Sequence, residues 1–470
     1  MGTINAAFSV MSQALDADQS ALNIVANNVA NANTPGYAKQ IPNWQENDPV
    51  VINGVSYGTG VTETGATSVR DRVLTQRLDQ QQQLASASGA RLSALNTLQA
   101  LFTPDSGSTS STSGDIGSDI TSLFSSFSSL ETNPTDNSLR EQVLSSASTL
   151  AGDVSNAAAS LNSQRSALNQ QTTGVVSQVN ALTGAIAQLN QQIRSISPNG
   201  DAGTLEDQRQ HDLSQLSQLI GINQVRTDDN GLAITTTSGQ LLVSADSSFQ
   251  LTSGTSGGVV HFYLGTTDVT EQLATGGGSL GGDLTARDQD IPNVLASLDQ
   301  LAYSVSTQVN ALNNAGTDLA GNNGNAGNIF SEPAQVAGSA WSMSVVMTDP
   351  NHISAGGLGQ GIGDNTNATS MANLGSQTIV NGQSPSNFYA SFVSTLGSTV
   401  SSVQTENIAQ NASVTQLQNQ NDALSSVNLN DEAVAMSTLE RSYQAASQVF
   451  AMLNTIMAAA LNLGEQTTVS

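Results

Sequence analysis

Each end of the chain carries an apolar repeat with a period of 3.5 residues, and this feature limits the possible folds most. At the start the repeat occupies Ile4, Phe8, Met11, Leu15, Leu22, Val25 and Val29. Between residues 431 and 464 it occupies Met436, Leu439, Tyr443, Phe450, Leu453 and Met457, with Ala446 and Ala460 in phase. Such a repeat makes a narrow apolar seam that packs against another helix. We therefore expect the two terminal helices to pair as a coiled coil, with the rest of the chain looped between them.

The two seams also allow a plainer interpretation, in which both helices are buried inside one subunit. We favour seams that other subunits complete, because both are narrow, both are terminal and few other apolar segments are free to cover them. The free subunit is then expected to have mobile ends that become ordered on assembly.

The composition favours elongated helical bundles and small β modules. The chain has 470 residues, enough for about three domains, but only 4% of them are aromatic and 10% are charged. A chain of this kind builds a thin core from Ala, Leu and Val.

The charge and the missing residue types exclude several classes of function. The net charge is −25, and Lys39 is the only lysine. Because phosphate contacts need clustered Lys or Arg, no nucleic-acid partner is expected, and an anionic membrane surface is disfavoured. The absence of cysteine excludes disulfides and thiolate metal sites and suits export as an unfolded chain. No stretch approaches the roughly 20 apolar residues that span a bilayer, so no membrane insertion is expected. The N-terminus has no basic residue before Lys39 and no continuous apolar block, so no cleaved secretory signal is expected.

Hydrophobic periodicity and turn residues predict a mainly α fold with an inserted antiparallel β domain. Helices are expected at residues 3–33, 69–101, 120–131, 138–197, 205–220, 288–312, 387–424 and 431–464. Strands are expected at residues 50–52, 60–62, 224–225, 232–237, 240–243, 259–264 and 343–347. The expected domains are a terminal-helix domain (1–45 and 431–470), a helical bundle (46–221 and 284–430) and an outer β domain (222–283).

The sequence gives no positive support for catalysis, a metal site or a cofactor. His211, His261 and His352 fall on a helix, a strand and a loop, without metal-ligand spacing. The glycine-rich run 356–363 lacks the flanking strand and helix of a dinucleotide site, and the acidic turn 228–231 lacks the glutamate that closes a calcium loop. We therefore expect a structural protein that is not an enzyme.

The end of the first helix resembles the N-terminal motif of bacterial flagellar axial proteins, the group that contains rod, hook and hook-associated proteins. The motif spans residues 25–37, and a proline and a glycine close together end the helix there. Its matching positions are Asn27, Asn28, Asn31, Asn33, Thr34, Pro35, Gly36 and Tyr37.

Three further stretches resemble the hook-associated protein 1 family, whose members join hook to filament. They are residues 133–141, residues 280–288 with 298–302, and residues 427–433 with 443–446 and 461–464. The long helical body at 138–220 distinguishes the chain from rod and hook proteins, which it resembles only at its ends. Lys39 and His211 depart from the family pattern, which has Arg and an acid at these positions.

The resemblance implies a function and a set of partners. Members of this family are exported through the flagellar type III apparatus with a dedicated chaperone and assemble outside the cell as a ring-like zone. The implied partners are other copies of the chain, hook protein and the filament-side junction protein, with the terminal helices forming the inner tube. The alternative is another axial protein, from the hook, the rod or the filament side of the junction. Asp18, in the first seam, is either an ordinary helix-face charge or a polar residue that fixes register or faces the channel.

Overall fold

The computed structural model describes residues 2–34, 36–52, 54–102, 115–196 and 202–465. Their contacts divide the chain into two compact units. The first unit comprises Met1–Gln83, Gln178–Gln250 and Asn411–Ser470, and the second comprises Leu84–Ser177 and Leu251–Gln410. Three long helices run through both units: α2 (Arg72–Ala100), α4 (Asn137–Ile196) and α11 (Pro385–Ser425).

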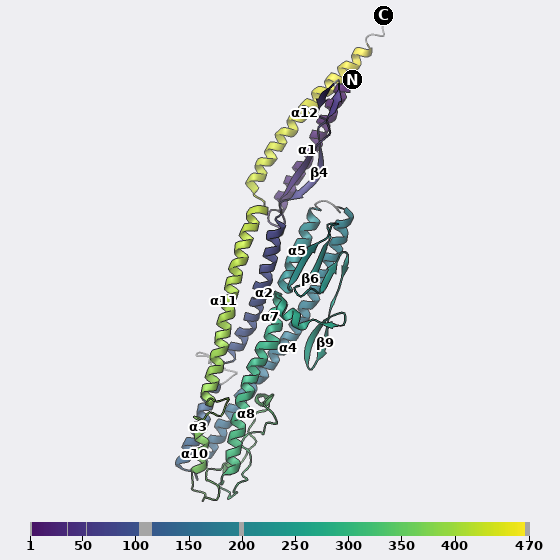
Figure 1. Cartoon of the computed structure of the whole chain (residues 1–470). Helices are drawn as coiled ribbons and strands as arrows, with labels where there is room; N and C mark the ends of the chain where they lie inside the picture. The colour runs from purple at the N-terminus through teal and green to yellow at the C-terminus, as the bar shows by residue number, and fades with distance from the viewer. Residues whose placement is uncertain (1, 35, 53, 103–114, 197–201, 466–470) are drawn as a thin grey trace. The chain divides into compact units, whose positions relative to one another are not determined.

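In the first unit the terminal helices α1 (Gly2–Asn31) and α12 (Leu429–Glu465) lie side by side and antiparallel (Figure 1). A β ribbon at residues 40–68 follows α1 and packs along it. Its base is the antiparallel pair β1 (Gln40–Glu46) and β4 (Val61–Ser68), which has an irregularity between Pro42 and Trp44. Its tip is the hairpin β2 (Val50–Ile52) and β3 (Val55–Tyr57).

The rest of the first unit joins helices to a four-stranded antiparallel sheet. The sheet has the order β5 (Ile222–Arg226), β6 (Leu232–Thr236), β7 (Leu241–Ser244) and β8 (Ser247–Ser248). It follows α5 (Thr204–Leu219) in the chain. Alternate residues of β6 are buried, as expected for a strand with one covered face.

The second unit has the larger apolar core. It contains α3 (Ile116–Thr132), α6 (Thr270–Gly276), α7 (Gly278–Thr285), a π-helical turn η1 (Ala286–Asp290), α8 (Ile291–Ala315), α9 (Ser339–Ser342), the 3-10 turn η2 (Pro350–His352) and α10 (Thr366–Asn373). Its sheet has the order β11 (Thr267–Asp268), β10 (Val259–Leu264), β9 (Leu251–Ser256). Phe127, Leu98 and Phe330 are among the fully buried members of the core.

The structure confirms a mainly helical fold with small antiparallel sheets, and it corrects two local predictions. The segment 343–347 is not a strand, because Val345 forms only an isolated bridge with Phe330. The helix expected at 288–312 begins as α8 only at Ile291, because residues 286–290 form the π-helical turn η1. The strands of residues 222–268 form two sheets, one in each unit. The division into three domains stays a prediction, as does coiled-coil geometry at the termini. No described helix is long and apolar enough to cross a membrane.

Candidate assembly site at the terminal helices

Asn28 joins three elements of the first unit. Its side-chain amide donates to the carbonyl oxygen of Gln40 at 2.8 Å and to Oε2 of Glu432 at 3.0 Å. Its Oδ1 accepts from the backbone N–H of Gln40 at 2.9 Å and from the Tyr37 hydroxyl at 2.8 Å. Asn28, Gln40 and Glu432 are all buried. One side chain therefore ties the end of α1 to the start of β1 and to the first turn of α12.

Lys39 completes this junction from the other side of Glu432. Its ammonium lies 2.7 Å from Oε1 of Glu432, and its backbone N–H donates to the carbonyl oxygen of Ser425 at 2.9 Å. Burial, and then the negative charge of Glu432, raise the pKa of the Tyr37 hydroxyl, which keeps it protonated as a donor to Asn28. Both oxygens of the buried carboxylate therefore have partners, as a buried charge requires.

The remaining residues of the axial motif form the turn that ends α1. Asn31 donates from Nδ2 to the Asn27 carbonyl oxygen at 3.0 Å, and Thr34 donates from its backbone N–H to the Asn31 carbonyl oxygen at 2.9 Å. Gly36 has a φ of +81°, a conformation that glycine adopts without strain. Asn33 is exposed, and Pro35 lies outside the described residues. The structure thus gives Asn28 a buried role that its neighbours in the motif do not share.

The terminal helices contact each other, and few of the predicted seam residues are fully covered. The rings of Phe8 and Phe450 lie 4.3 Å apart. In α1, Val25 is buried and Val29 is 40% exposed, while Ile4, Met11, Leu15 and Leu22 are partly buried. In α12, Tyr443 is 37% exposed, and Met436, Leu439, Leu453 and Met457 are partly buried. Asp18 is buried at 9% exposure, and its role in register stays a prediction.

Two exposed apolar surfaces were not singled out from the sequence. The outer row of α12 consists of Val449, Met452 and Ile456, which are 39%, 57% and 52% exposed. The spacing of three and four residues, offset from the seam, is the signal that could have found it. The second surface is the ribbon tip, with Val50, Val55 and Tyr57 about half exposed.

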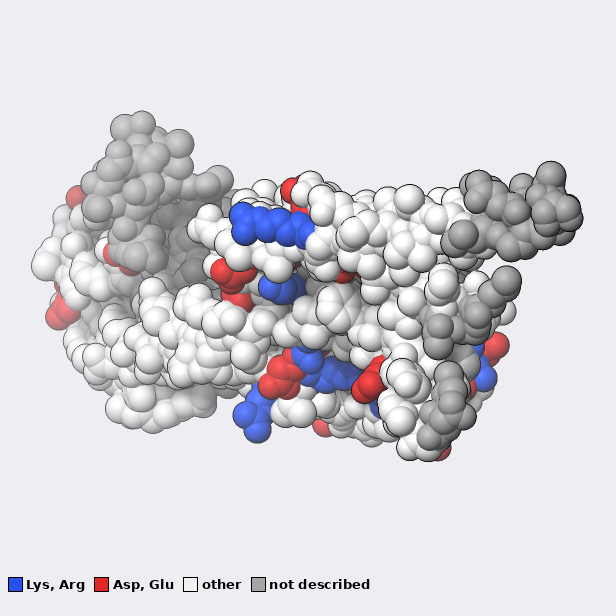
Figure 2. Space-filling model, turned by 90° about the horizontal axis from the view of Figure 1, so that it is seen from above, with Lys and Arg blue, Asp and Glu red and all other residues white. Residues whose placement is uncertain are grey.

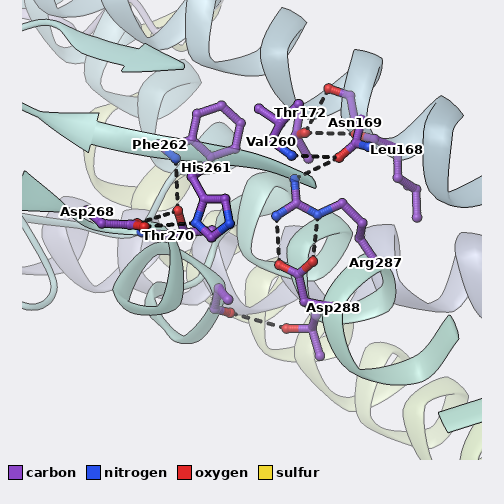
Figure 3. A network of polar contacts seen from close by, with 12 residues as sticks. Leu168, Asn169, Thr172, Val260, His261, Phe262, Asp268, Thr270, Arg287 and Asp288 are labelled. Atoms are coloured by element: carbon purple, nitrogen blue, oxygen red, sulfur yellow. Dashed lines mark hydrogen bonds and ion pairs between the residues drawn. The ribbon is translucent and has the colours of Figure 1, made fainter. Parts of the chain in front are cut away.

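Two of the three other motifs lie mainly in the second unit, and each places one arginine in a fully buried position. Arg287 is fully buried in η1 and donates to both carboxylate oxygens of Asp288 at 2.8 and 2.7 Å and to Oδ1 of Asn169 in α4 at 3.1 Å (Figure 3). The same Oδ1 accepts from the backbone N–H of Val260 in β10 at 3.4 Å. Arg140 is also fully buried and donates to the carbonyl oxygen of Pro134. These side chains connect structural elements and present no reacting group.

The histidines lie on separate elements and have local partners. His211 contacts Gln215 at 2.9 Å, His261 contacts Asp268 at 2.8 Å, and the buried Asp318 contacts His352 at 2.8 Å. In the described part of the chain no group of three or more His, Cys, Asp or Glu side chains could hold a metal ion. On the face shown in Figure 2, most of the described surface is uncharged, and Lys and Arg side chains lie close to Asp and Glu.

Comparison with known proteins connects this architecture to the flagellum. Residues 8–37 match the family model of flagella basal body rod proteins, and residues 106–330 match that of the helical domain of flagellar hook-associated protein FlgK. Flagellar hook-associated protein 1 of Escherichia coli is 25% identical over 546 residues, covering 96% of this chain and 98% of the relative. Flagellar hook-associated protein 1 of Bacillus subtilis is 27% identical over 504 residues, covering 96% of each.

A solved structure shares the fold. The flagellar hook junction protein FlgK from Burkholderia pseudomallei superposes with a TM-score of 0.64 at 19% identity, over 73% of this chain and 99% of that one. Paired terminal helices, with the rod-protein match across the first of them, define a flagellar axial protein. Within that class, the chain contains the helical domain of flagellar hook-associated protein FlgK and is similar to flagellar hook-associated protein 1 over 96% of its length.

Proposed function

We propose that this chain is a structural subunit of the bacterial flagellum that forms the junction between hook and filament, outside the cell. The observation that carries the proposal is the agreement of the curated relatives over 96% of the chain, which includes both terminal helices. The helical body distinguishes it from a rod protein, since the rod-protein match is confined to residues 8–37.

The terminal helices supply a physical reason for assembly. The seam residues of α12 are only partly buried against α1, and Val449, Met452 and Ile456 face solvent. Fully burying an apolar side chain of this size contributes roughly 1.5–3 kcal/mol. A neighbouring subunit, hook protein or the filament-side junction protein would cover this surface. The seam residues are therefore the proposed subunit contacts.

The proposed route to the junction is export as an unfolded chain through the flagellar type III apparatus, with a chaperone on the C-terminal helix. A chain without cysteine forms no disulfide before it leaves the cell. The exposed row on α12 offers such a chaperone an apolar helix face.

A deletion strain tests the proposal. Cells that lack the gene should build hooks of normal length, assemble no filament and release flagellin into the medium, and the intact gene should restore filaments. Filaments of normal number without the protein would overturn the proposal.

The alternative is a rod or hook protein, which the match at residues 8–37 supports. The two proposals differ in the deletion strain, because loss of a rod or hook protein would leave no completed hook. Immunogold labelling of intact flagella also distinguishes the two locations. Label at the distal end of the hook supports the junction, and label along the hook supports the alternative.

We further propose that the chain has no catalytic role. The family is one of structural flagellar proteins, and the buried arginines and the terminal junction offer no nucleophile paired with a base. Purified subunit should release no soluble fragments from isolated cell wall; release that is absent from a matched preparation made without the subunit would contradict this.

A further inference from the structure

We propose that the ribbon tip of one copy packs against the outer row of α12 in the next copy, so that neighbouring subunits lie side by side and are joined by a heterologous contact. The inference rests on the proposed function, because it requires copies side by side in an axial assembly. It adds an interface between two surfaces that are both uncovered in the single chain.

The ribbon tip presents apolar side chains on one face. Val50 pairs with Tyr57 across the hairpin, so the two share a face, and Val55 lies two residues before Tyr57 on the same face. They are 49%, 50% and 54% exposed. A two-stranded hairpin is marginally stable alone, so a partner that covers this face would also stabilise the tip.

The outer row of α12 points away from α1. At 100° per residue, Val449, Met452 and Ile456 lie about 100–160° around the helix from Phe450, whose ring contacts Phe8. On α1, Gln13 accepts a hydrogen bond from Asn47 of the ribbon. Gln13 lies about 140° around the helix from Phe8. The ribbon and α12 therefore contact different sides of α1, which leaves the tip and the outer row free for other molecules.

The two surfaces lie at the same height along the helix pair. The ribbon follows α1 from Asn28, which bonds Gln40, to Gln13, which bonds Asn47 at 3.0 Å. Three further residues at about 3.3 Å each bring the strand to Val50, about 10 Å beyond Asn47. About 10 Å along α1 from Gln13 is about seven residues, close to Phe8, which contacts Phe450 of α12. A sideways displacement of a second copy, with little axial shift, brings the tip against Val449 and Met452.

The absence of charge at both surfaces favours a second copy of this chain as the occupant. The chain carries a net charge of −25, so most contacts between copies meet like-charge repulsion. Residues 49–62 and residues 442–464 contain no Asp, Glu, Lys or Arg. Because the two surfaces differ, their contact is heterologous, and a heterologous contact repeats from copy to copy into a ring or a helical array.

Cysteine cross-linking in purified flagella tests the contact, since the chain has no cysteine of its own. Cells whose only copy carries Val55→Cys and Met452→Cys supply the flagella, which are oxidised with copper phenanthroline and analysed on a non-reducing gel with an antibody against the chain. We expect a ladder of dimers and larger oligomers that dithiothreitol collapses. Val55→Cys alone and Met452→Cys alone are expected to remain monomeric.

The matched control pairs Val55→Cys with Val434→Cys. Val434 is 68% exposed on the same helix, but lies 18 residues from Met452, or about 27 Å away. This pair should remain monomeric. The inference is overturned by monomers only from the Val55/Met452 pair, by an equal ladder from the Val434 pair, or by dimers from Val55→Cys alone. If the chain is absent from the purified flagella, the proposed function fails, and the inference fails with it.

Discussion

Asn28 in the first helix and Glu432 in the last are 404 residues apart in the sequence and are joined by a buried hydrogen bond of 3.0 Å. The bond fixes the point at which the end of α1, the start of the ribbon and the first turn of α12 meet. Lys39 neutralises the same carboxylate at 2.7 Å. The relative placement of the two terminal helices therefore depends on a small buried polar group as well as on the apolar seams.

Replacing Asn28 with Ala should loosen this junction. The substitution removes four hydrogen bonds and leaves the buried N–H and carbonyl of Gln40 and the Glu432 carboxylate with fewer partners. Each unsatisfied buried group costs about 1–3 kcal/mol, so we expect the free energy of local opening at α1 and α12 to fall by about 2–4 kcal/mol. Hydrogen exchange of peptides from these helices measures it. Asn33→Ala, at an exposed position of the same motif, is the control and should change the opening energy by less than about 0.5 kcal/mol.

Lys39 and Glu432 should be energetically coupled. Glu432→Gln leaves Lys39 without its counter-charge, and Lys39→Met leaves a buried carboxylate with Asn28 alone. The double variant avoids both penalties, so the two single changes should sum to more than the double change by about 1–3 kcal/mol. Chemical denaturation of all four proteins completes the cycle. Additive effects would show that the ion pair is not a unit.

Asp79 should make the first unit more stable in mild acid. Burial raises the pKa of Asp79 to about 6, against the opposing hydrogen bonds from Gln224 and Gln210, while its ordinary value is 3.8. Because the folded pKa is the higher one, the favourable contribution is complete below about pH 4 and is lost as the pH rises through 6. Asp79→Asn should therefore gain free energy of unfolding relative to the native chain between pH 4 and pH 8, by up to about 3 kcal/mol.

Burial also raises the pKa of Asp283, to about 6, and that of Asp119, to about 7 with a contribution from Asp153. The contribution of Asp79 is therefore isolated by the difference in free energy of unfolding between the native chain and Asp79→Asn at each pH. A difference that stays constant from pH 4 to pH 8 would contradict its buried, neutral state.

Gly282→Ala should destabilise the second unit strongly. A Cβ at this position would lie 2.1 Å from the carbonyl oxygen of Ala87 and 2.9 Å from the backbone nitrogen of Arg91, so α7 and α2 would have to separate. Overpacking typically costs about 1–3 kcal/mol and occasionally more, and contacts with backbone atoms, which cannot rotate away, place this variant at the upper end. Gly152→Ala is the matched control, because nothing lies within 4 Å of its added Cβ in α4. That variant should be more stable by about 0.5–1 kcal/mol, as is usual for glycine in a helix interior. Thermal melts of both variants give the comparison.

The long helices could be predicted from the sequence because their apolar periodicity continues for many turns. Residues 138–197 were expected as one helix, and α4 spans Asn137–Ile196. The prediction of a strand at 343–347 was wrong for a physical reason. Met343 and Met347 are buried, but among the described residues the segment has no neighbouring strand, and only Val345 forms a bridge, an isolated one with Phe330. Composition indicates burial there, and pairing depends on a distant segment that local patterns do not specify.

At the terminal site the apolar periodicity of the two helices is visible in the sequence, but the polar junction is not. Four asparagines lie close together at the end of α1, and nothing local identifies Asn28 as the buried one. Its position after Ala21, Ile24 and Val25, all buried on the same face of α1, is the signal that helical spacing could have given. Its partner Glu432 comes from the other end of the chain, and only the fold brings the two together.

Hydrogen exchange of the terminal helices before and after assembly tests most directly the claim that neighbouring subunits complete them. In the free subunit, amides of residues 4–29 and 436–457 should exchange much faster than those in the core of α4. In purified flagella their protection should rise by about 100-fold or more, since burial of the open apolar faces adds to the opening energy. Terminal helices protected as strongly as α4 in the free subunit, with no further gain in the flagellum, would contradict the account.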